Sequence, residues 1–210
     1  MEQIAHKIGS LILDLIFPCF CLSCNKEGAF LCEKCRSTKL KFLNKHSRPL
    51  CAFDYENTLV RELVYAFKYE QLKSLDKTLA SLMFDFLKEK KIRFDQTWTV
   101  SFVPSHPRKE NIRGFNQSEL LAKRLAGILG LACSAALKKI RSTRPQMQLN
   151  RIQRLDNLKA AFEAIGSVKN KKIILIDDVC TTGATMNECR DTLLAAGASR
   201  VSCFAFAKDI

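Results

Sequence analysis

The chain lacks the features of a membrane-spanning or secreted protein. Apolar residues near the N-terminus recur at helical spacing, but this run is short and contains Asp14, whereas a spanning helix needs roughly 17–25 apolar residues. Neither a basic start nor a small-residue cleavage site frames the run, which disfavours a signal peptide. We therefore expect a cytoplasmic protein that begins with an amphipathic helix.

Internal repeats, low-complexity tracts and glycine- or serine-rich linkers are also missing. The only boundary that the sequence indicates is therefore the end of a cysteine-rich start, near residue 50. The chain contains no Walker P-loop and no GxGxxG fingerprint, so two common phosphate-binding motifs are excluded.

The composition is that of a globular protein with an excess of positive charge. A chain of 210 residues with 47% hydrophobic content can bury one substantial core and a small added module. The formal net charge of +13 favours an anionic partner: a nucleic acid, a phosphorylated metabolite or a membrane surface. Charge alone does not choose among them.

Four of the ten cysteines form the pattern Cys21-x2-Cys24-x7-Cys32-x2-Cys35. Each CxxC pair can place two thiolates on one tetrahedral ion, so this spacing predicts a structural zinc site. Buried or redox-active thiols are the alternative interpretation. The other cysteines beyond residue 50 stand in apolar surroundings and are expected in the core.

From about residue 55, segments with helical spacing alternate with strand-like segments. Helices are expected in 59–69, 77–89 and 116–129, the last capped by Asn116 and Glu119, and a strand in 97–103. A strand at 172–177, a helix from about Thr185 to Ala196 and a strand at 200–207 form a βαβ unit. The fold class is therefore α/β, with a parallel sheet flanked by helices.

Two aspartates follow directly after the apolar strand at 172–177. In an open parallel sheet, ligands bind outside the carboxyl ends of the strands, and Asp177 and Asp178 fall at that position. Two acids cannot hold a phosphate, but they can accept hydrogen bonds from vicinal hydroxyls or from metal-bound water. The next turn, CTTGAT, offers hydroxyls and backbone N–H groups at a helix N-terminus, which favours an anion. Together they describe a site for a ribose 5-phosphate, unless the aspartates form only a solvated turn.

Three stretches carry a resemblance to a known family. IILIDDVCTTGAT resembles the 5-phosphoribosyl-1-pyrophosphate (PRPP) signature of type I phosphoribosyltransferases. FVPSHPRKENIRGFNQSELLAKRLA and LKKIRSTRPQMQLNRIQRLDNLKAAF resemble two further signatures of the ComF family, whose members also carry an N-terminal zinc module. The resemblance implies a zinc module at residues 1–50 and a phosphoribosyltransferase-like domain at residues 51–210.

The resemblance also implies roles for individual residues. The ribose hydroxyls and Mg²⁺ would be bound by Asp177 and Asp178, and the 5-phosphate by Thr181, Thr182, Gly183, Ala184 and Thr185. The pyrophosphate loop would contain Ser105, Arg108 and Lys109. A basic segment without acids would close over pyrophosphate or follow a DNA backbone; it contains Lys138, Lys139, Arg141, Arg144, Arg151 and Arg154, with Arg113 as a further basic residue. Solvated basic surfaces are the alternative for both segments.

The function that the resemblance implies is natural transformation. The chain would bind PRPP with Mg²⁺ and single-stranded DNA, and would meet the DNA-uptake machinery at the inner face of the membrane. The residues leave open whether it is a transferase that displaces pyrophosphate from PRPP or a module in which PRPP regulates DNA binding. The alternative is a metabolic phosphoribosyltransferase with an unknown acceptor and no role with DNA.

Overall fold

A computed structural model describes residues 19–43, 49–70, 72–105, 114–140 and 161–209. The chain divides into two compact units, Met1–Lys41 and Phe42–Ile210. In the first unit, an antiparallel bridge pairs Phe20 with Glu27, and helix α2 (Glu33–Lys39) follows. No helix in the described ranges is long and apolar enough to cross a membrane.

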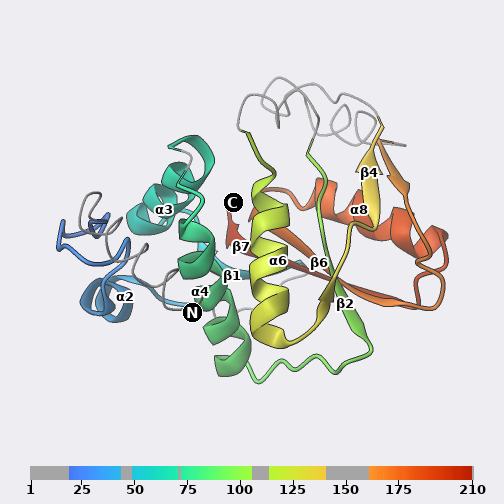
Figure 1. The fold of residues 1–210 in the computed structure, drawn as a ribbon, viewed down its shortest axis with the longest axis horizontal. Coiled ribbons are helices and arrows are strands. Elements are labelled where there is room, and N and C mark those ends of the chain that lie inside the picture. The colour runs from blue at the N-terminus through green and yellow to red at the C-terminus, as the bar shows by residue number, and fades with distance from the viewer. Residues whose placement is uncertain (1–18, 44–48, 71, 106–113, 141–160, 210) are drawn as a thin grey trace, which may run out of the picture. The chain divides into compact units, whose positions relative to one another are not determined.

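The second unit is built on a parallel sheet of five strands in the order β1-β7-β6-β2-β3 (Figure 1). The strands are β1 (Leu50–Asp54), β2 (Trp98–Phe102), β3 (Ala132–Cys133), β6 (Lys172–Cys180) and β7 (Arg200–Lys208). The neighbouring strands β6 and β7 are joined by helix α8 (Ala184–Ala195). This confirms the predicted βαβ unit and the α/β fold class.

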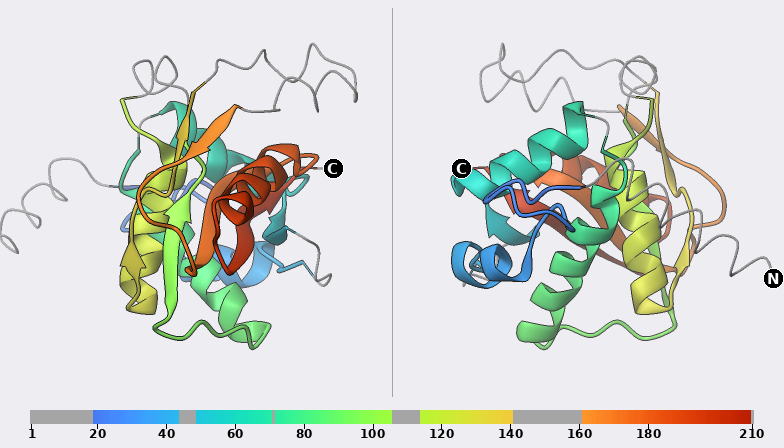
Figure 2. Two further views of the ribbon diagram at one scale, coloured as in Figure 1. Left: turned by 90° about the vertical axis from the view of Figure 1, so that its right-hand side faces the viewer. Right: turned by 60° about the vertical axis from the view of Figure 1, so that its left-hand side comes forward.

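Helices cover both faces of the sheet. Helices α4 (Leu75–Glu89) and α6 (Gln117–Leu129) pack on one face and α8 on the other, as the turned view shows (Figure 2). The first face buries aromatic rings: Phe86 stacks on Phe204, and Phe53 contacts Phe206. The α8 face buries smaller side chains, including the Cys189 and Cys203 thiols that were expected in the core.

Helix α3 (Thr58–Tyr69) precedes α4. It starts where the Asn57 side chain accepts hydrogen bonds from the N–H groups of Leu59 and Val60. Its apolar positions recur every three or four residues, so one face is buried against the unit. A separate antiparallel pair joins β4 (Leu137–Lys139) to β5 (Phe162–Ala164).

Strand β6 is longer than its apolar run predicts. We expected it to end at residue 177, but it pairs with β7 as far as Cys180 opposite Lys208. The backbone of Asp177 and Asp178 continues the sheet because β7 extends equally far, which supplies partners that the local sequence does not reveal.

The domain boundary near residue 50 stays a prediction; in the structure Phe42 already belongs to the second unit, with its ring against Phe53.

Candidate functional site

The acid pair lies where three segments of the second unit meet. Asp177 and Asp178 stand near the carboxyl end of β6. The neighbouring strand β2 ends at Phe102, and the Val103 N–H donates to the Ile176 carbonyl oxygen at 3.0 Å, so the segment to Ser105 leaves the sheet beside the acids. The first turn of α6 reaches the same place through Ser118.

Asp177 is held by the start of α6. The Ser118 hydroxyl donates to its Oδ1 at 2.7 Å, and the Asp178 backbone N–H donates to the same oxygen at 2.9 Å. Burial raises the pKa of the Asp177 carboxyl to about 7, and the Asp178 charge adds to this, while Ser118 and Lys68 act in the opposite direction. The Asp177 carboxyl is therefore protonated more easily than an ordinary aspartate.

Asp178 is held by a cation from α3. The Lys68 ammonium lies 3.0 Å from Asp178 Oδ1, and the exposed fractions of the two side chains are only 18% and 12%. The Val179 N–H also donates to this carboxylate. Each acid of the pair therefore has a partner on a helix: Ser118 on α6 for Asp177, and Lys68 on α3 for Asp178.

The turn after β6 brings hydroxyls and backbone donors to the start of α8. Thr181 and Thr182 are exposed, and the Thr182 hydroxyl accepts from the Ala184 N–H at 3.4 Å. The N-cap residue is Gly183, which has no side chain to cap the helix, so the first turn of α8 presents N–H groups as an anion site requires. Gly183 has φ +77°, and an added Cβ would lie 3.3 Å from Pro49 Cδ, so this position requires glycine.

The other predicted site residues are described only in part. Ser105 lies just after β2, whereas Arg108, Lys109, Arg113, Arg141, Arg144, Arg151 and Arg154 fall outside the described residues. Two of the basic residues lie on β4. Lys138 pairs with Glu163 at 3.1 Å, and the Lys139 ammonium lies 5.4 Å from the centre of the Phe162 ring.

Sequence reasoning did not assign Ser118 and Lys68 to the site. Ser118 was visible in the stretch GFNQS that precedes a helix, and Lys68 stands between two aromatic residues in YAFKY. Neither pattern shows which carboxylate its residue contacts, because the partners lie 59 and 110 positions away along the chain.

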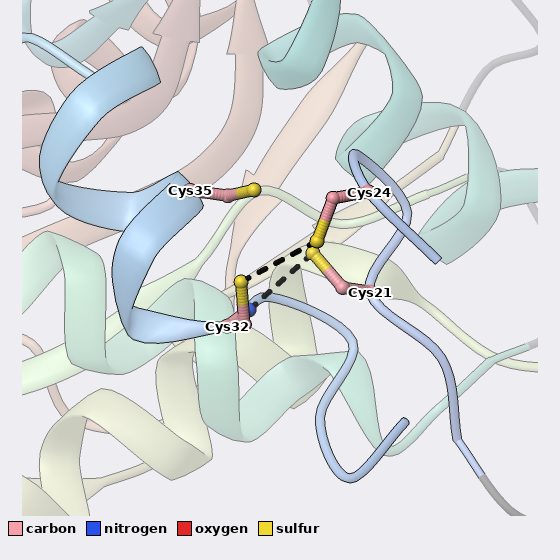
Figure 3. A group of neighbouring side chains, drawn as sticks. All are labelled: Cys21, Cys24, Cys32 and Cys35. Carbon is pink, nitrogen blue, oxygen red and sulfur yellow. Dashed lines mark hydrogen bonds between the residues drawn. The ribbon is translucent and has the colours of Figure 1, made fainter. Parts of the chain in front are cut away.

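The first unit contains a separate candidate metal centre. Cys21 and Cys24 come from a turn, and Cys32 and Cys35 from the start of α2; the four side chains point toward one another (Figure 3). Their sulfur atoms all lie within 4.8 Å of each other, and the Sγ atoms of Cys24 and Cys32 are 3.6 Å apart. Four sulfurs bound tetrahedrally to zinc at about 2.3 Å would be about 3.8 Å apart, so the cluster fits a metal ion of this kind.

The thiols of the cluster shift one another's pKa in opposite directions. The Lys26 N–H lowers the pKa of Cys24, but hydrogen bonding with the Cys35 and Cys32 side chains raises it overall to about 11. Burial opposes ionisation of Cys21, but N–H donors, first among them that of Cys32, lower its pKa to about 6. A thiolate is the form that binds a metal.

A basic groove of about 840 Å³ lies away from the acid pair, along the amino-terminal half of β7. Its basic lining residues are Arg93, Lys172, Arg190 and Arg200, and Asp95 is the single acid among the described residues of the lining. The Arg200 guanidinium lies 5.6 Å from the centre of the Trp98 ring. The groove therefore offers positive charge beside an aromatic side chain, but its described lining has no acid pair for a sugar.

Comparison with known proteins identifies the class of the second unit. Residues 116–210 match the family described as phosphoribosyl transferase domain, and this range includes the acid pair and its turn. Among solved structures, the allosteric regulatory enzyme of purine biosynthesis aligns with a TM-score of 0.42 and 22% identity over 62% of this chain and 25% of that chain. That likeness is too distant to bear on function. The domain match and the sheet together define a phosphoribosyltransferase-like protein.

Two curated relatives show to which family of phosphoribosyltransferase-like proteins the chain is similar. The DNA utilization protein YhgH of Salmonella typhimurium is 33% identical over 66% of this chain and 63% of its own length, so the chain spans less than two thirds of that relative. The competence protein ComFC of Streptococcus pneumoniae is 29% identical over 99% of this chain and 96% of its own length. The chain belongs to the ComF family, as its motifs predicted.

Proposed function

We propose that the second unit binds PRPP together with Mg²⁺. The observation that carries this proposal is the order of groups at the end of β6: two carboxylates, then a turn with hydroxyls, then a helix that begins at a glycine. The carboxylates suit the two ribose hydroxyls, and the N–H groups at the start of the helix suit the 5-phosphate.

In this proposal, different residues bind different parts of PRPP. Asp177 and Asp178 accept hydrogen bonds from the sugar and from water on Mg²⁺, and residues 181–185 surround the 5-phosphate. Ser118 fixes the Asp177 carboxylate so that its second oxygen can face the ligand. When bound, Mg²⁺ neutralises charge on the pyrophosphate.

The test is a calorimetric titration of PRPP with and without Mg²⁺, on the wild type and on the Asp177→Asn/Asp178→Asn double variant. We expect Mg²⁺-dependent binding that the double variant loses while it stays folded. Unchanged PRPP affinity in the folded double variant would refute the site. A scan of acceptors for pyrophosphate release then separates a transferase from a binding module.

We further propose that the protein acts on single-stranded DNA in natural transformation. Two findings support this role: the net charge of +13 and the similarity to proteins named for competence and DNA utilization. The alternative, a metabolic phosphoribosyltransferase, becomes the better interpretation when no salt-sensitive binding of single-stranded DNA is measured.

For the first unit we propose one structural zinc ion on Cys21, Cys24, Cys32 and Cys35. The unit is small, and a bound metal would supply part of its folding free energy. Metal analysis of freshly purified, reduced protein should find one zinc per chain. The Cys35→Ser variant should lose it, and Cys133→Ser, outside the cluster, should keep it. Wild type without zinc would contradict the assignment.

A further inference from the structure

The amino-terminal half of β7 has a neighbouring strand on one side only. Strand β7 pairs with β6 from Arg200 to Lys208, whereas its other neighbour, β1, begins opposite Phe204 (Figure 1). Within the described ranges, no further strand lies beside β7. Residues 200–203 therefore form an open edge of the sheet, and this edge lines the basic groove.

The backbone along this edge carries groups that another strand could bond. Asp209, just past β7, donates its N–H to β6 at 2.9 Å, and the Lys208 carbonyl oxygen accepts from the Tyr55 N–H, just past β1, at 2.8 Å. Residues of odd number in β7 therefore direct their backbone groups to β6, and residues of even number direct theirs to the side of β1. By this alternation the N–H and C=O of Ser202 and the C=O of Arg200 point to the open edge.

A proline explains why β1 does not extend along this edge. The register that sets the Tyr55 N–H against the Lys208 carbonyl oxygen sets the position of Pro49 against the carbonyl oxygen of Ser202. Pro49 has no N–H and cannot donate this next bond of the ladder. An edge left open in this way can pair with a strand from another chain.

The walls of the groove determine which chain would fit. Its described lining has four basic side chains and one acid, Asp95, and this acid lies 3.9 Å from Lys172. The Arg200 guanidinium lies 5.6 Å from the centre of the Trp98 ring, which the Phe94 ring meets edge-on at 5.0 Å. A cation held beside an aromatic wall at the open edge matches an acidic side chain on the incoming strand.

We infer that this edge is a docking site for an extended acidic segment of a partner protein, which adds as a strand beside β7. N–H groups of the segment would donate to the Arg200 and Ser202 carbonyl oxygens, and one of its carbonyl oxygens would accept from the Ser202 N–H. The phosphate backbone of DNA also matches the charge, but it has no donors for these two carbonyls. Residues 200–203 span about 13 Å, which suits a short linear segment.

Synthetic peptides test the docking by fluorescence anisotropy. The probe is a short capped peptide of alternating glutamate and valine, and its counterpart has lysine in place of glutamate. We expect the acidic peptide to bind the wild type at least about tenfold more tightly than the basic one. Arg93→Ala/Arg200→Ala should remove this preference. Arg61→Ala/Lys77→Ala, which removes two exposed charges from α3 and α4, should keep it.

N-methylated peptides separate strand addition from attraction by charge alone. Methylation of the backbone nitrogens of either the glutamates or the valines keeps every side chain but removes the N–H donors along one edge of the peptide. We expect one of the two patterns to abolish binding and the other to bind as the unmodified peptide does.

Three results would overturn the proposal. If the acidic peptide does not bind the wild type, the docking site is wrong. If both methylated peptides bind as tightly as the unmodified one, the groove attracts only charge, and strand addition is wrong. If single-stranded oligothymidylate displaces the peptide and depends on the same two arginines, the groove takes a nucleic acid instead of a protein segment.

Discussion

The two carboxylates of the acid pair differ in their partners although they are adjacent in the chain. Asp177 accepts from a neutral hydroxyl, and its pKa is raised to about 7, whereas Asp178 lies against the Lys68 cation. A ribose or a magnesium ion that binds here therefore meets one carboxyl with a raised pKa and one that is already paired with an ammonium group.

The raised pKa of Asp177 predicts how stability depends on pH. Because the pKa in the folded protein lies above the unfolded value of about 3.9, folding favours the protonated form, and stability falls as pH rises through about 4 to 7. Asp177→Asn removes this dependence. We expect its melting temperature to exceed that of the wild type by roughly several degrees at pH 8, with a smaller gain at pH 5. Melting curves of both proteins across this range, without ligand, check the sign; a lower melting temperature of the variant at pH 8 would contradict it.

Removal of one partner of the Lys68–Asp178 ion pair should lower the unfolding free energy strongly. Lys68→Met leaves the Asp178 carboxylate without its cation at a position where its side chain is only 12% exposed, which should cost on the order of 3 kcal/mol of unfolding free energy. Lys138→Met is the matched control, because its pair with Glu163 has side chains 51% and 52% exposed and should cost less than about 1 kcal/mol. Urea denaturation measures both variants. Equal costs would show that the Lys68 pair is not structurally important.

At the scale of the elements, the helices and strands follow from local pattern. The spacing of apolar residues predicted α3, α4, α6 and α8 to within about two residues at their ends, and Asn116 caps α6 through the Ser118 N–H as expected. The second expected cap, Glu119, pairs instead with Lys123 one turn later at 2.6 Å. Local signals are strong here because a helix needs only its own residues and one buried face.

Contacts between elements could not be predicted in the same way. The four-cysteine cluster was visible because its members lie within 15 consecutive residues, from Cys21 to Cys35. The pairs Ser118–Asp177 and Lys68–Asp178 depend on which helices cover the carboxyl end of β6, and that is decided by packing of the whole unit. The same holds for the extension of β6 to Cys180, which requires the length of β7.

The turn between β6 and α8 predicts a glycine-specific effect. Gly183→Ala gives a residue with a Cβ the positive φ of +77°, which strains the backbone, and places that Cβ 3.3 Å from Pro49 Cδ, which crowds the proline. We expect a loss of about 1–3 kcal/mol of stability and a loss of PRPP binding, since the turn carries the proposed phosphate donors. Gly166→Ala is the control: φ is +66°, but nothing lies within 4 Å of the added Cβ. It should cost only the backbone strain and leave PRPP affinity unchanged, as thermal melts and titrations can show.

At the scale of the whole molecule, positive charge is spread over at least two regions that could meet a polyanion. The basic segment from Lys138 to Arg154 begins within β4, and the groove along β7 carries Arg93, Lys172 and Arg200. We expect the first region to bind the backbone of single-stranded DNA, since it contains no acid, whereas Lys172 in the groove already lies 3.9 Å from Asp95.

Salt dependence can decide between the two regions. Each phosphate contact on a single strand contributes about 0.7 to the slope of log affinity against log salt concentration. Arg141→Ala/Arg144→Ala/Arg151→Ala should therefore flatten the slope by roughly 2 and weaken binding to all sequences about equally. The matched variant Arg93→Ala/Lys172→Ala/Arg200→Ala removes the same number of charges and should leave the slope near that of the wild type. Fluorescence anisotropy over a salt series, with and without PRPP and Mg²⁺, measures all three proteins. A charge that contacts no phosphate releases no counterion, so its removal leaves the slope unchanged. If only the groove variant flattens the slope, the surface that binds DNA lies along β7, and the role given to the basic segment is wrong.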